Sequence, residues 1–428
     1  MVSPFPSSVL IVGAGAAGLM AARGLVRAGR QVTIIEARDR IGGRIWPLPK
    51  AEFGYEAEGG AEFVHGEAPV THALLDEAGF SLAPLTGVRW DARGDDTSPD
   101  TSLGPDDTGF HETLMTLKTD MPVVEFLDTH FGGGRYASMR KSILRMVEGY
   151  DAADPKKVST FALRDEWMSE GIEQQGRVAE GYGALLDFLA ADCRKHGVAI
   201  RLETMVTAIE GKPGRVTVRC SDGAALEADA AIVTVPLPLL PTIALPAVAR
   251  ERLAAISDIG FGNVVKILLR FKTAFWTTHN GNDLSDLSFV FGDAKVQTWW
   301  TQHPDHHPVL TGWFAGPKAD TVATLSGEQL VDMGVTSLAT LFKRPVDALR
   351  GELVAARAIN WGNDPFARGA YSYATPKTRA AQAVLETSDG SGVYFSGEAF
   401  YAGRDMGTVE AALAHGRDTA RRIAADNP

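Results

Sequence analysis

This chain of 428 residues has few cysteines and no long hydrophobic run that is free of proline. Cys193 and Cys220 fall in different expected elements without metal-ligand spacing, so neither a disulfide framework nor a zinc site is indicated. We expect both to be packing residues. The longest apolar stretch, residues 230–249, has the length of a membrane span, but its prolines cannot continue one helix. We expect a strand that enters a loop there.

Positive charge is also in deficit, because 42 lysines and arginines face 53 aspartates and glutamates, for a net charge of −11. This balance argues against a nucleic-acid partner and mildly favours a cationic ligand. Residues 1–8 contain no basic and apolar signal region, and the polar residues 416–428 contain no anchor. We therefore expect a soluble, cytoplasmic protein with no membrane partner.

Two polar segments have the composition of loops. Residues 91–109 are acidic and rich in Pro, Gly and Ser, which favours a solvated loop. The segment HPDHHP at 303–308 invites a metal interpretation, but its two prolines favour a turn between strands near Trp299 and Leu310. No repeats are visible, and the length and 45% hydrophobic content favour two domains.

The most informative segment is residues 9–44, which joins strand, glycine turn, helix and second strand. Gly13, Gly15 and Gly18 have the spacing that lets a backbone approach a pyrophosphate and then pack against a helix. Glu36 ends the second strand, where its carboxylate can accept hydrogen bonds from a ribose. The expected elements are a strand at Val9–Val12, a helix at Ala16–Ala28 and a strand at Gln31–Ile35.

A second glycine pair follows Glu36 at once. Gly42, Gly43 and Arg44 would bring backbone N–H groups and a guanidinium toward the same pyrophosphate, a clamp that a typical nicotinamide domain lacks. This GGR run resembles FAD-dependent amine oxidases, the family of monoamine, polyamine and L-amino-acid oxidases and lysine-specific histone demethylases. Further segments resemble that family in its own order: GGAEFVHG (59–66), AEGYGALLDFLA (179–190), VTAIEGKPGRVTV (206–218), DAAIVTVPLPLL (229–240), GFGNVVKILLRF (260–271), WGNDPFARGAYSY (361–373) and FSGEAFYAGRDMGTVEAALAHG (395–416).

The resemblance implies an α/β fold with two discontinuous domains. The first is a Rossmann-like FAD-binding domain with a doubly wound parallel sheet, expected at residues 1–70, 197–258 and 389–428. The second is an α+β substrate domain with a mixed sheet, expected at 71–196 and 259–388. The cofactor-binding residues that it implies are Gly13, Gly15, Ala16, Ala17, Gly18, Glu36, Ala37, Arg38, Gly42, Gly43, Arg44, Gly60, Ala61, Glu62, Val206, Trp361, Gly397, Glu398, Gly407, Thr408 and Val409.

Lys266 is the first candidate catalytic residue. It lies in a segment of strand composition, where alternation puts Val264, Lys266 and Leu268 on one face among apolar neighbours. A buried ammonium is costly unless it is used, and the resemblance places this lysine beside flavin N5, where it holds a water at the site of oxygen reaction. The alternative is a lysine that reaches solvent at a sheet edge.

The other candidates come from the resemblance. Trp361 belongs to the wall on the substrate side of the flavin, and Tyr371 takes the place of a cage tyrosine that aligns the substrate nitrogen through a cation–π effect. Thr408 stands where monoamine oxidases place a second cage tyrosine, which implies half a cage and a wider cavity. His65 matches a polyamine-oxidase histidine near the substrate nitrogen. Core packing for the aromatic residues and a structural histidine are the alternatives.

Two more implied features concern the flavin. Ala370 stands where monoamine oxidases carry the cysteine bonded to the flavin, so FAD is expected to be non-covalent. Glu398 matches a residue near the ribitol and pyrophosphate. A helix expected at Gly407–His415 points its partial positive charge at N1 and the C2 carbonyl, which favours the anionic reduced ring.

These features predict an FAD-dependent amine oxidase. A polyamine or a related secondary or primary amine is oxidised to an imine, water hydrolyses the imine to an aldehyde plus an amine, and O2 becomes hydrogen peroxide. His65 and Thr408 favour polyamines. The alternatives are an L-amino-acid oxidase, for which the sequence places no guanidinium, and a non-catalytic flavin-binding scaffold.

Overall fold

A five-stranded parallel sheet carries the glycine turn at the carboxyl end of its central strand. The computed structural model describes residues 7–93, 98–99, 108–167, 175–212 and 214–425. All four strand pairs of this sheet are parallel, which confirms the prediction of a parallel sheet. Across the sheet the strands are β22 (Val393–Phe395), β12 (Ala230–Val233), β1 (Ser8–Val12), β2 (Gln31–Ile35) and β8 (Ala199–Arg201).

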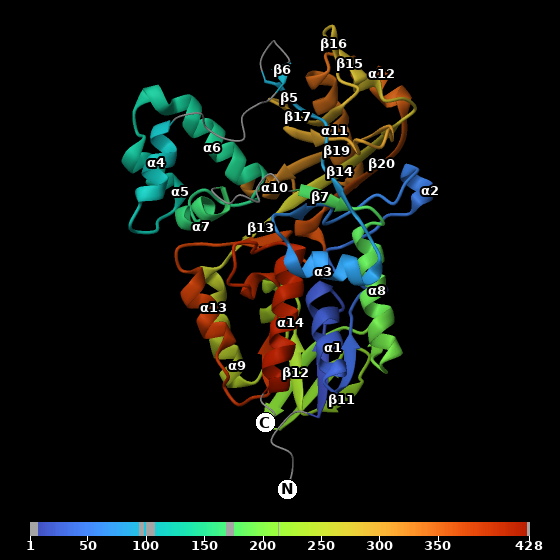
Figure 1. The fold of residues 1–428 in the computed structure, drawn as a ribbon, viewed down its shortest axis with the longest axis vertical. Helices are drawn as coiled ribbons and strands as arrows, with labels where there is room; N and C mark the ends of the chain where they lie inside the picture. The colour runs from blue at the N-terminus through green and yellow to red at the C-terminus, as the bar shows by residue number, and fades with distance from the viewer. Residues whose placement is uncertain (1–6, 94–97, 100–107, 168–174, 213, 426–428) are drawn as a thin grey trace.

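Helices cover one face of this sheet. Alternation along β1 turns Val9 and Ile11 toward them, where they share a core with Leu19, Leu185 and Leu413. Figure 1 shows the helices side by side in the lower part of the molecule. They are α1 (Ala16–Arg27), α3 (Pro69–Ala78), α8 (Tyr182–Lys195) and α14 (Val409–Ala425).

A small antiparallel sheet covers the other face. Leu10 and Val12 of β1 pack there with Val216 and Val218. Its strands are β9 (Val206–Lys212), β10 (Arg215–Cys220) and β11 (Ala225–Ala228). The expected strand and loop at 230–249 is β12 followed by short helical turns. These are η2 (Leu237–Thr242) and the start of α9 (Ala247–Arg252), followed by η3 (Leu253–Asp258).

A seven-stranded mixed sheet forms the second part of the molecule, at the upper right of Figure 1. Only β17 and β5 run parallel, and the other neighbours are antiparallel. The strand order is β20 (Leu353–Asn360), β14 (Val264–Phe271), β19 (Val309–Ala315), β18 (Thr298–Trp300), β17 (Leu287–Gly292), β5 (Val88–Ala92) and β6 (Ser98–Pro99). The helices α11 (Gly327–Leu341) and α12 (Val346–Glu352) pack against it.

The expected alternation of β14 is confirmed. Val264 and Leu268 share one core with Trp361, whereas Val265 and Ile267 share another. Both neighbouring strands pair with β14 along its length, so side chains on both of its faces are buried.

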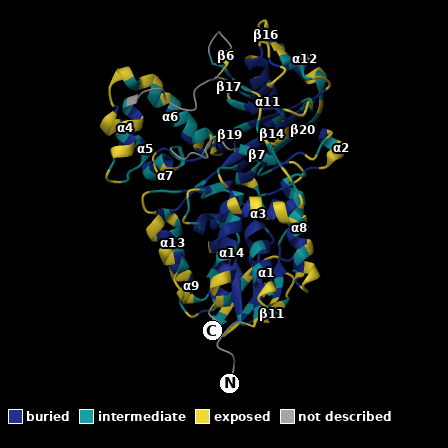
Figure 2. Cartoon of the chain, in the orientation of Figure 1, coloured by how far each residue is buried: buried dark blue, intermediate teal, exposed yellow. Residues whose placement is uncertain are grey.

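Four helices form a separate group at the upper left of Figure 1, around their own core of Phe110, Phe126, Ile143 and Leu163. They are α4 (Thr108–Thr116), α5 (Val123–His130), α6 (Ala137–Gly149) and α7 (Thr160–Trp167). Figure 2 shows buried residues along both large sheets and exposed residues on the outer sides of α4, α9 and α13 (Thr378–Glu386).

Short strands and turns connect these parts. They are β3 (Val64–His65), β4 (Leu82–Pro84), β7 (Gln175–Val178), β13 (Gly260–Gly262), β15 (Thr278–His279), β16 (Asn282–Asp283), β21 (Tyr371–Tyr373), α2 (Lys50–Phe53), α10 (Pro317–Asp320), η1 (Gly134–Tyr136), η4 (Phe275–Thr277), η5 (Trp361–Asn363) and η6 (Glu398–Phe400). No helix within the described ranges combines the length and the apolar character that a bilayer crossing needs.

The expected domain boundaries need a correction. α3 and α8 fall in the segment 71–196, assigned to the substrate domain, yet Leu74 and Leu185 pack with Val9 and Ile11 of the parallel sheet. The reason is tertiary, because an amphipathic helix buries its apolar stripe against whichever sheet lies nearest. The five strands of the parallel sheet all lie within the segments assigned to the FAD-binding domain.

The acidic segment 91–109 is not wholly a loop. Asp91 and Ala92 end β5, and Ser98–Pro99 form β6, which pairs with Trp90 and Asp91. Edge strands tolerate the Pro and polar residues that made this segment resemble a loop. Residues 94–97 and 100–107 lie outside the described residues.

Two smaller predictions are confirmed. HPDHHP is a turn between β18 and β19. Cys193 and Cys220 are free, buried thiols that pack in two different cores.

The contact between α1 and α14 yields a test of stability. A Cβ on Gly416 of α14 would lie 2.3 Å from the Ala17 carbonyl oxygen of α1. We expect Gly416→Ala to push the helices apart and lower the free energy of unfolding in urea by about 1–3 kcal/mol. Gly351→Ala is the control, because nothing lies within 4 Å of a Cβ at that position in α12. Equal stability of both variants would contradict this account of the contact.

Candidate active site

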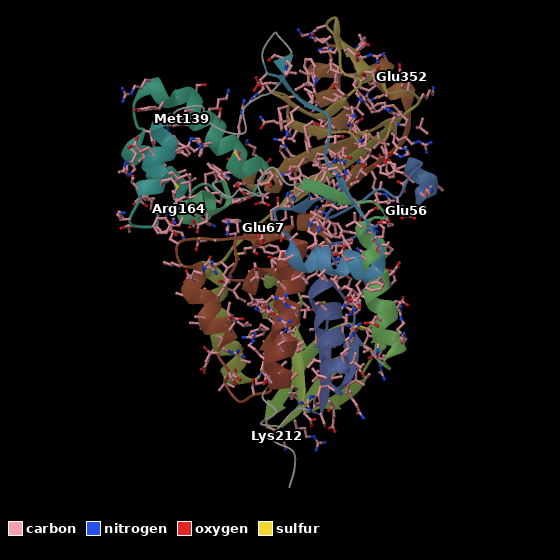
Figure 3. The ribbon with its side chains drawn as sticks, in the orientation of Figure 1. Glu56, Glu67, Met139, Arg164, Lys212 and Glu352 are labelled. Carbon is pink, nitrogen blue, oxygen red and sulfur yellow. The ribbon has the colours of Figure 1, made fainter. Side chains whose placement is uncertain are left out.

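One cavity of about 1460 Å³ runs from the parallel sheet to the mixed sheet. Ordinary small-ligand pockets have roughly 300–1,000 Å³, so this one has room for a dinucleotide and a second molecule. Glu67 is one of its lining residues, and Figure 3 shows it between the lower and upper parts of the molecule. Every predicted site residue except Gly18 lines this cavity.

The glycine turn forms the lower end of the cavity. Gly13 has φ +111°, and a Cβ there would lie 2.5 Å from Thr234 Oγ1, so only glycine fits. Gly18 has a packing role instead, because a Cβ there would lie 2.0 Å from the Gly13 carbonyl oxygen. Gly15 precedes α1 and no side chain caps this helix, which leaves backbone N–H groups for an anion.

Glu36 ties this turn to the strand that follows it. Its Oε2 accepts a hydrogen bond from Ala14 N at 2.7 Å, and its Oε1 accepts one from Arg38 N at 2.8 Å. The carboxylate is buried beside the cavity. It therefore shapes the turn, and ribose binding by its remaining lone pairs stays a prediction.

The segment of Gly42, Gly43 and Arg44 contacts the glycine turn. Gly42 N donates to Ala14 O at 2.9 Å, and Gly42 and Gly43 both have positive φ. The Arg44 guanidinium donates to Ala370 O at 2.7 Å and to Glu398 Oε1 at 2.8 Å. The other oxygen of Glu398 accepts a hydrogen bond from the Ser372 hydroxyl. Arg44 and Glu398 are thus held together at the cavity wall.

Lys266 lies in the cavity wall with no solvent exposure. Its Nζ donates to Glu62 Oε2 at 2.8 Å and to Gly60 O at 3.1 Å. Burial alone would raise the pKa of Glu62, but the charges of Lys266 and Arg177 lower that pKa to about 2. Glu62 is predicted as a cofactor ligand, but its carboxylate accepts hydrogen bonds from protein side chains.

The upper end of the cavity is aromatic. Tyr371 Oη donates to the Tyr150 carbonyl oxygen at 2.8 Å, and Tyr150 Oη lies 3.2 Å from His65 Nδ1. Burial lowers the pKa of His65 to about 4, so this imidazole is neutral at pH 7. Trp361 donates from Nε1 to Gly59 O at 3.2 Å, which fixes its ring.

Thr408 lies at the start of α14, which begins at Val409 and not at the expected Gly407. Its Oγ1 accepts a hydrogen bond from Ala411 N at 3.1 Å and donates to Asp405 O at 2.6 Å. The hydroxyl is thus used as a helix cap. The cage role of Thr408 stays a prediction that concerns the room it leaves.

The sequence analysis missed two acids that meet at this wall. Asp151 follows α6 and Glu166 lies in α7, and both side chains line the cavity close enough for their carboxyl groups to interact. Burial raises the pKa of Asp151 well above its usual range and that of Glu166 to about 7. No spacing motif links the two residues. The net negative charge was the only signal.

Arg89 is a further missed residue. It lines the same cavity, and its guanidinium lies 5.8 Å from the ring centre of Phe289. Among the described residues, none forms a hydrogen bond or ion pair with this guanidinium. The sequence offered no sign of its position.

Known proteins share sequence or fold with this chain. The family model described as flavin containing amine oxidoreductase matches residues 16–97 and 112–424. Polyamine oxidase 4 of Oryza sativa subsp. japonica is 28% identical over 96% of this chain and 87% of its own length. Lysine-specific histone demethylase 2 of Homo sapiens is 28% identical over 92% of this chain, which spans 50% of that protein.

Solved structures share the fold. Wild-type putrescine oxidase bound to putrescine has a TM-score of 0.79 at 23% identity, and the match covers 98% of this chain and 99% of that one. Cyclohexylamine oxidase from Brevibacterium oxydans IH-35A has a TM-score of 0.79 at 20% identity, with the same coverage.

Glu36 gives a test of the cofactor end. We expect Glu36→Ala to release the turn and to lose charged hydrogen bonds of roughly 1.5–3 kcal/mol, which weakens FAD binding about tenfold to a hundredfold. Recovery of flavin fluorescence on dilution measures the dissociation constant. Glu210→Ala, on the exposed face of β9, is the control. An unchanged constant in Glu36→Ala would exclude this role.

Proposed function

Because the chain belongs to the flavin-containing amine oxidoreductase family, we propose that it oxidises a polyamine or related cationic amine to an imine. Water then hydrolyses the imine to an aldehyde plus an amine, and O2 is reduced to H2O2. The observation that carries the choice of substrate is the carboxyl pair of Asp151 and Glu166 in the cavity wall near Tyr371.

FAD is the cofactor, and the lower end of the cavity fits it. The N-terminus of α1, which no side chain caps, and Arg44 would hold the phosphates, and Glu36 would hold a ribose. Ala370 lines the cavity with a methyl group, so this position offers no thiol for a covalent link. Bound there, FAD would supply the acceptor for a hydride equivalent from the α-carbon of the amine and the two electrons that reduce oxygen.

His65 and Tyr150 prepare the reacting nitrogen. Gln175 Nε2 donates to Tyr150 Oη at 3.2 Å, so the phenol proton is directed to His65 Nδ1. We assign the imidazole proton to Nε2 on that basis. This neutral tautomer offers a donor to the lone pair of an uncharged amine, and the reacting form of the amine is uncharged. Tyr371 supplies the aromatic face that aligns it.

The carboxyl pair holds a second, distal ammonium. Two buried carboxyl groups in contact cannot both ionise cheaply, and an ammonium beside them compensates the second charge. A diamine or polyamine therefore binds with one nitrogen at Tyr371 and another at the pair. A monoamine lacks the second contact.

Arg89 favours a second candidate function. An L-amino-acid oxidase needs a guanidinium for the substrate carboxylate, and Arg89 lines the cavity without an ion-pair partner among the described residues. The carboxyl pair would repel that carboxylate, so the amine remains the proposal. We also propose a cytoplasmic location, which the two free thiols support.

A panel of amines and amino acids tests the function. Anaerobic mixing with the holoenzyme measures bleaching of the flavin, and peroxide release measures turnover with oxygen. We expect diamines and polyamines to reduce the flavin fastest. Faster reduction by L-amino acids would favour the second candidate, and no reduction by any compound would favour a flavin-binding scaffold.

The distal site gives a sharper prediction. Glu166→Gln should raise KM for a diamine about tenfold or more, because an ammonium loses a charged partner, and leave a monoamine of the same length unchanged. The matched control is Glu148→Gln, at the cavity wall but already paired with Lys318 at 2.5 Å.

The same pair predicts a pH dependence. Glu166 ionises as the pH rises through about 7, so the wild-type KM for the diamine should fall across that range and level off above it. Glu166→Gln should remove this trend. Equal effects of Glu166→Gln on diamine and monoamine would contradict the distal site.

A further inference from the structure

The Glu62 carboxylate lies between the buried Lys266 and three other donors. Oε2 accepts from Lys266 Nζ at 2.8 Å. Oε1 accepts from Arg177 Nε at 2.9 Å, and from Trp300 Nε1 and Gln302 Nε2 at 3.0 Å each. Glu62 is 8% exposed and Lys266 is 0% exposed. A carboxylate with this many donors has its position and its charge determined by the protein.

The Lys266 ammonium is in turn directed by its acceptors. It has three N–H donors, of which Glu62 Oε2 takes one and Gly60 O takes another. The Trp300 ring lies 5.5 Å from Nζ and adds a cation–π contact. Because Lys266 also lines the cavity, one N–H remains for a group inside it.

We propose that Glu62 is a positioning residue for the oxygen reaction, which keeps the Lys266 ammonium charged and points its remaining N–H into the cavity. The inference rests on the proposed function only in taking oxygen as the acceptor. A fixed positive charge there stabilises negative charge that develops on oxygen as it is reduced. Glu62 touches neither oxygen nor amine and acts through Lys266.

Other charged groups surround the pair and enter the design of the test. Glu58 is buried, its Oε1 accepts from Tyr182 N at 2.9 Å, and its Oε2 has no hydrogen-bond partner among the described residues. Burial raises its pKa to about 7 despite the nearby Lys266 charge. The buried Tyr55 hydroxyl likewise finds no hydrogen-bond partner within the described ranges, and burial raises its pKa. On the neighbouring strands, Lys266 faces Trp313 and Ile359, which do not titrate.

The first test measures the oxygen step without any amine. The holoenzyme is reduced with dithionite or light and mixed with oxygenated buffer from pH 6 to pH 9.5. Wild type should reoxidise at a nearly constant rate. Glu62→Gln leaves a buried lysine without its counter-ion, so the lysine loses its proton at lower pH and the rate falls about tenfold between pH 6 and pH 9.

Matched variants separate charge from shape. Glu62→Asp keeps the anion and should retain a flat profile. Arg177→Gln removes a partly buried positive charge but leaves the Glu62 anion beside Lys266, so its reoxidation rate should not fall at alkaline pH. Lys266→Met should be slow at every pH. The Glu62→Gln profile should persist in a Glu58→Gln background, which excludes titration of Glu58 as its cause.

A second measurement does not depend on catalysis. Urea unfolding of the holoenzyme, followed by tryptophan fluorescence, should show Glu62→Gln destabilised at pH 6. In this variant the folded state binds fewer protons than the unfolded one above the lowered lysine pKa, so the deficit relative to wild type should shrink as the pH rises. The double variant Glu62→Gln/Lys266→Met should lose that pH dependence.

The outcomes are distinct. A flat Glu62→Gln reoxidation profile, or a deficit in unfolding that is constant with pH, would overturn the positioning role. Equal slowing by Glu62→Gln and Glu62→Asp at every pH would overturn it as well, because only shape would then matter. Failure of every amine to reduce the flavin would reject the proposed substrate class and leave both measurements intact.

Discussion

The buried ion pair of Lys266 and Glu62 is the interaction on which the arrangement of the cavity depends. A lysine with no solvent exposure needs a counter-charge, and Glu62 supplies it from the segment that follows the second glycine clamp. The same carboxylate accepts hydrogen bonds from Arg177 of β7 and from Trp300 of β18. One pair therefore joins the cofactor end of the chain to the mixed sheet, and the cavity forms between them.

The two ends of the cavity differ in the groups that form them and in how far apart these groups lie in the sequence. At the lower end, backbone N–H groups, glycines and Glu36 lie close together in the sequence, and close approach of the backbone is what matters there. At the upper end, side chains from distant segments supply the chemistry. His65, Tyr150 and Tyr371 form one chain of contacts, and the carboxyl groups of Asp151 and Glu166, whose pKa values are raised by burial, line the same cavity. An amine that carries a second ammonium matches both features.

Local sequence patterns predicted the helices and strands well where hydrophobic periodicity and glycine positions sufficed to define them. The strand Gln31–Ile35 has the expected bounds, and the helix expected at Ala16–Ala28 ends one residue earlier, at Arg27. The expected domain boundaries and the expected loop at 91–109 agree less well with the structure. α3 and α8 pack against the parallel sheet, and β6 pairs with β5 as a short edge strand. Glu62 was expected at the cofactor, but a linear sequence does not show that Lys266, 204 positions away, becomes its partner.

Residues 9–44 by themselves predict a dinucleotide-binding site. The strand, the turn and the helix are adjacent in the sequence, and the spacing of the glycines determines the backbone conformation of the turn. Alternation placed Lys266 among apolar neighbours but left open a lysine at a sheet edge, and only the folded structure, with β14 inside the mixed sheet, shows that it is buried. The acid pair, the orientation of His65 and the position of the Arg89 guanidinium, which has no ion-pair partner among the described residues, arose only on folding. The pKa values of His65 and Glu166 depend on burial, and Arg89 depends on a neighbour, Phe289, that lies far away in the sequence. A local sequence pattern contains neither kind of information.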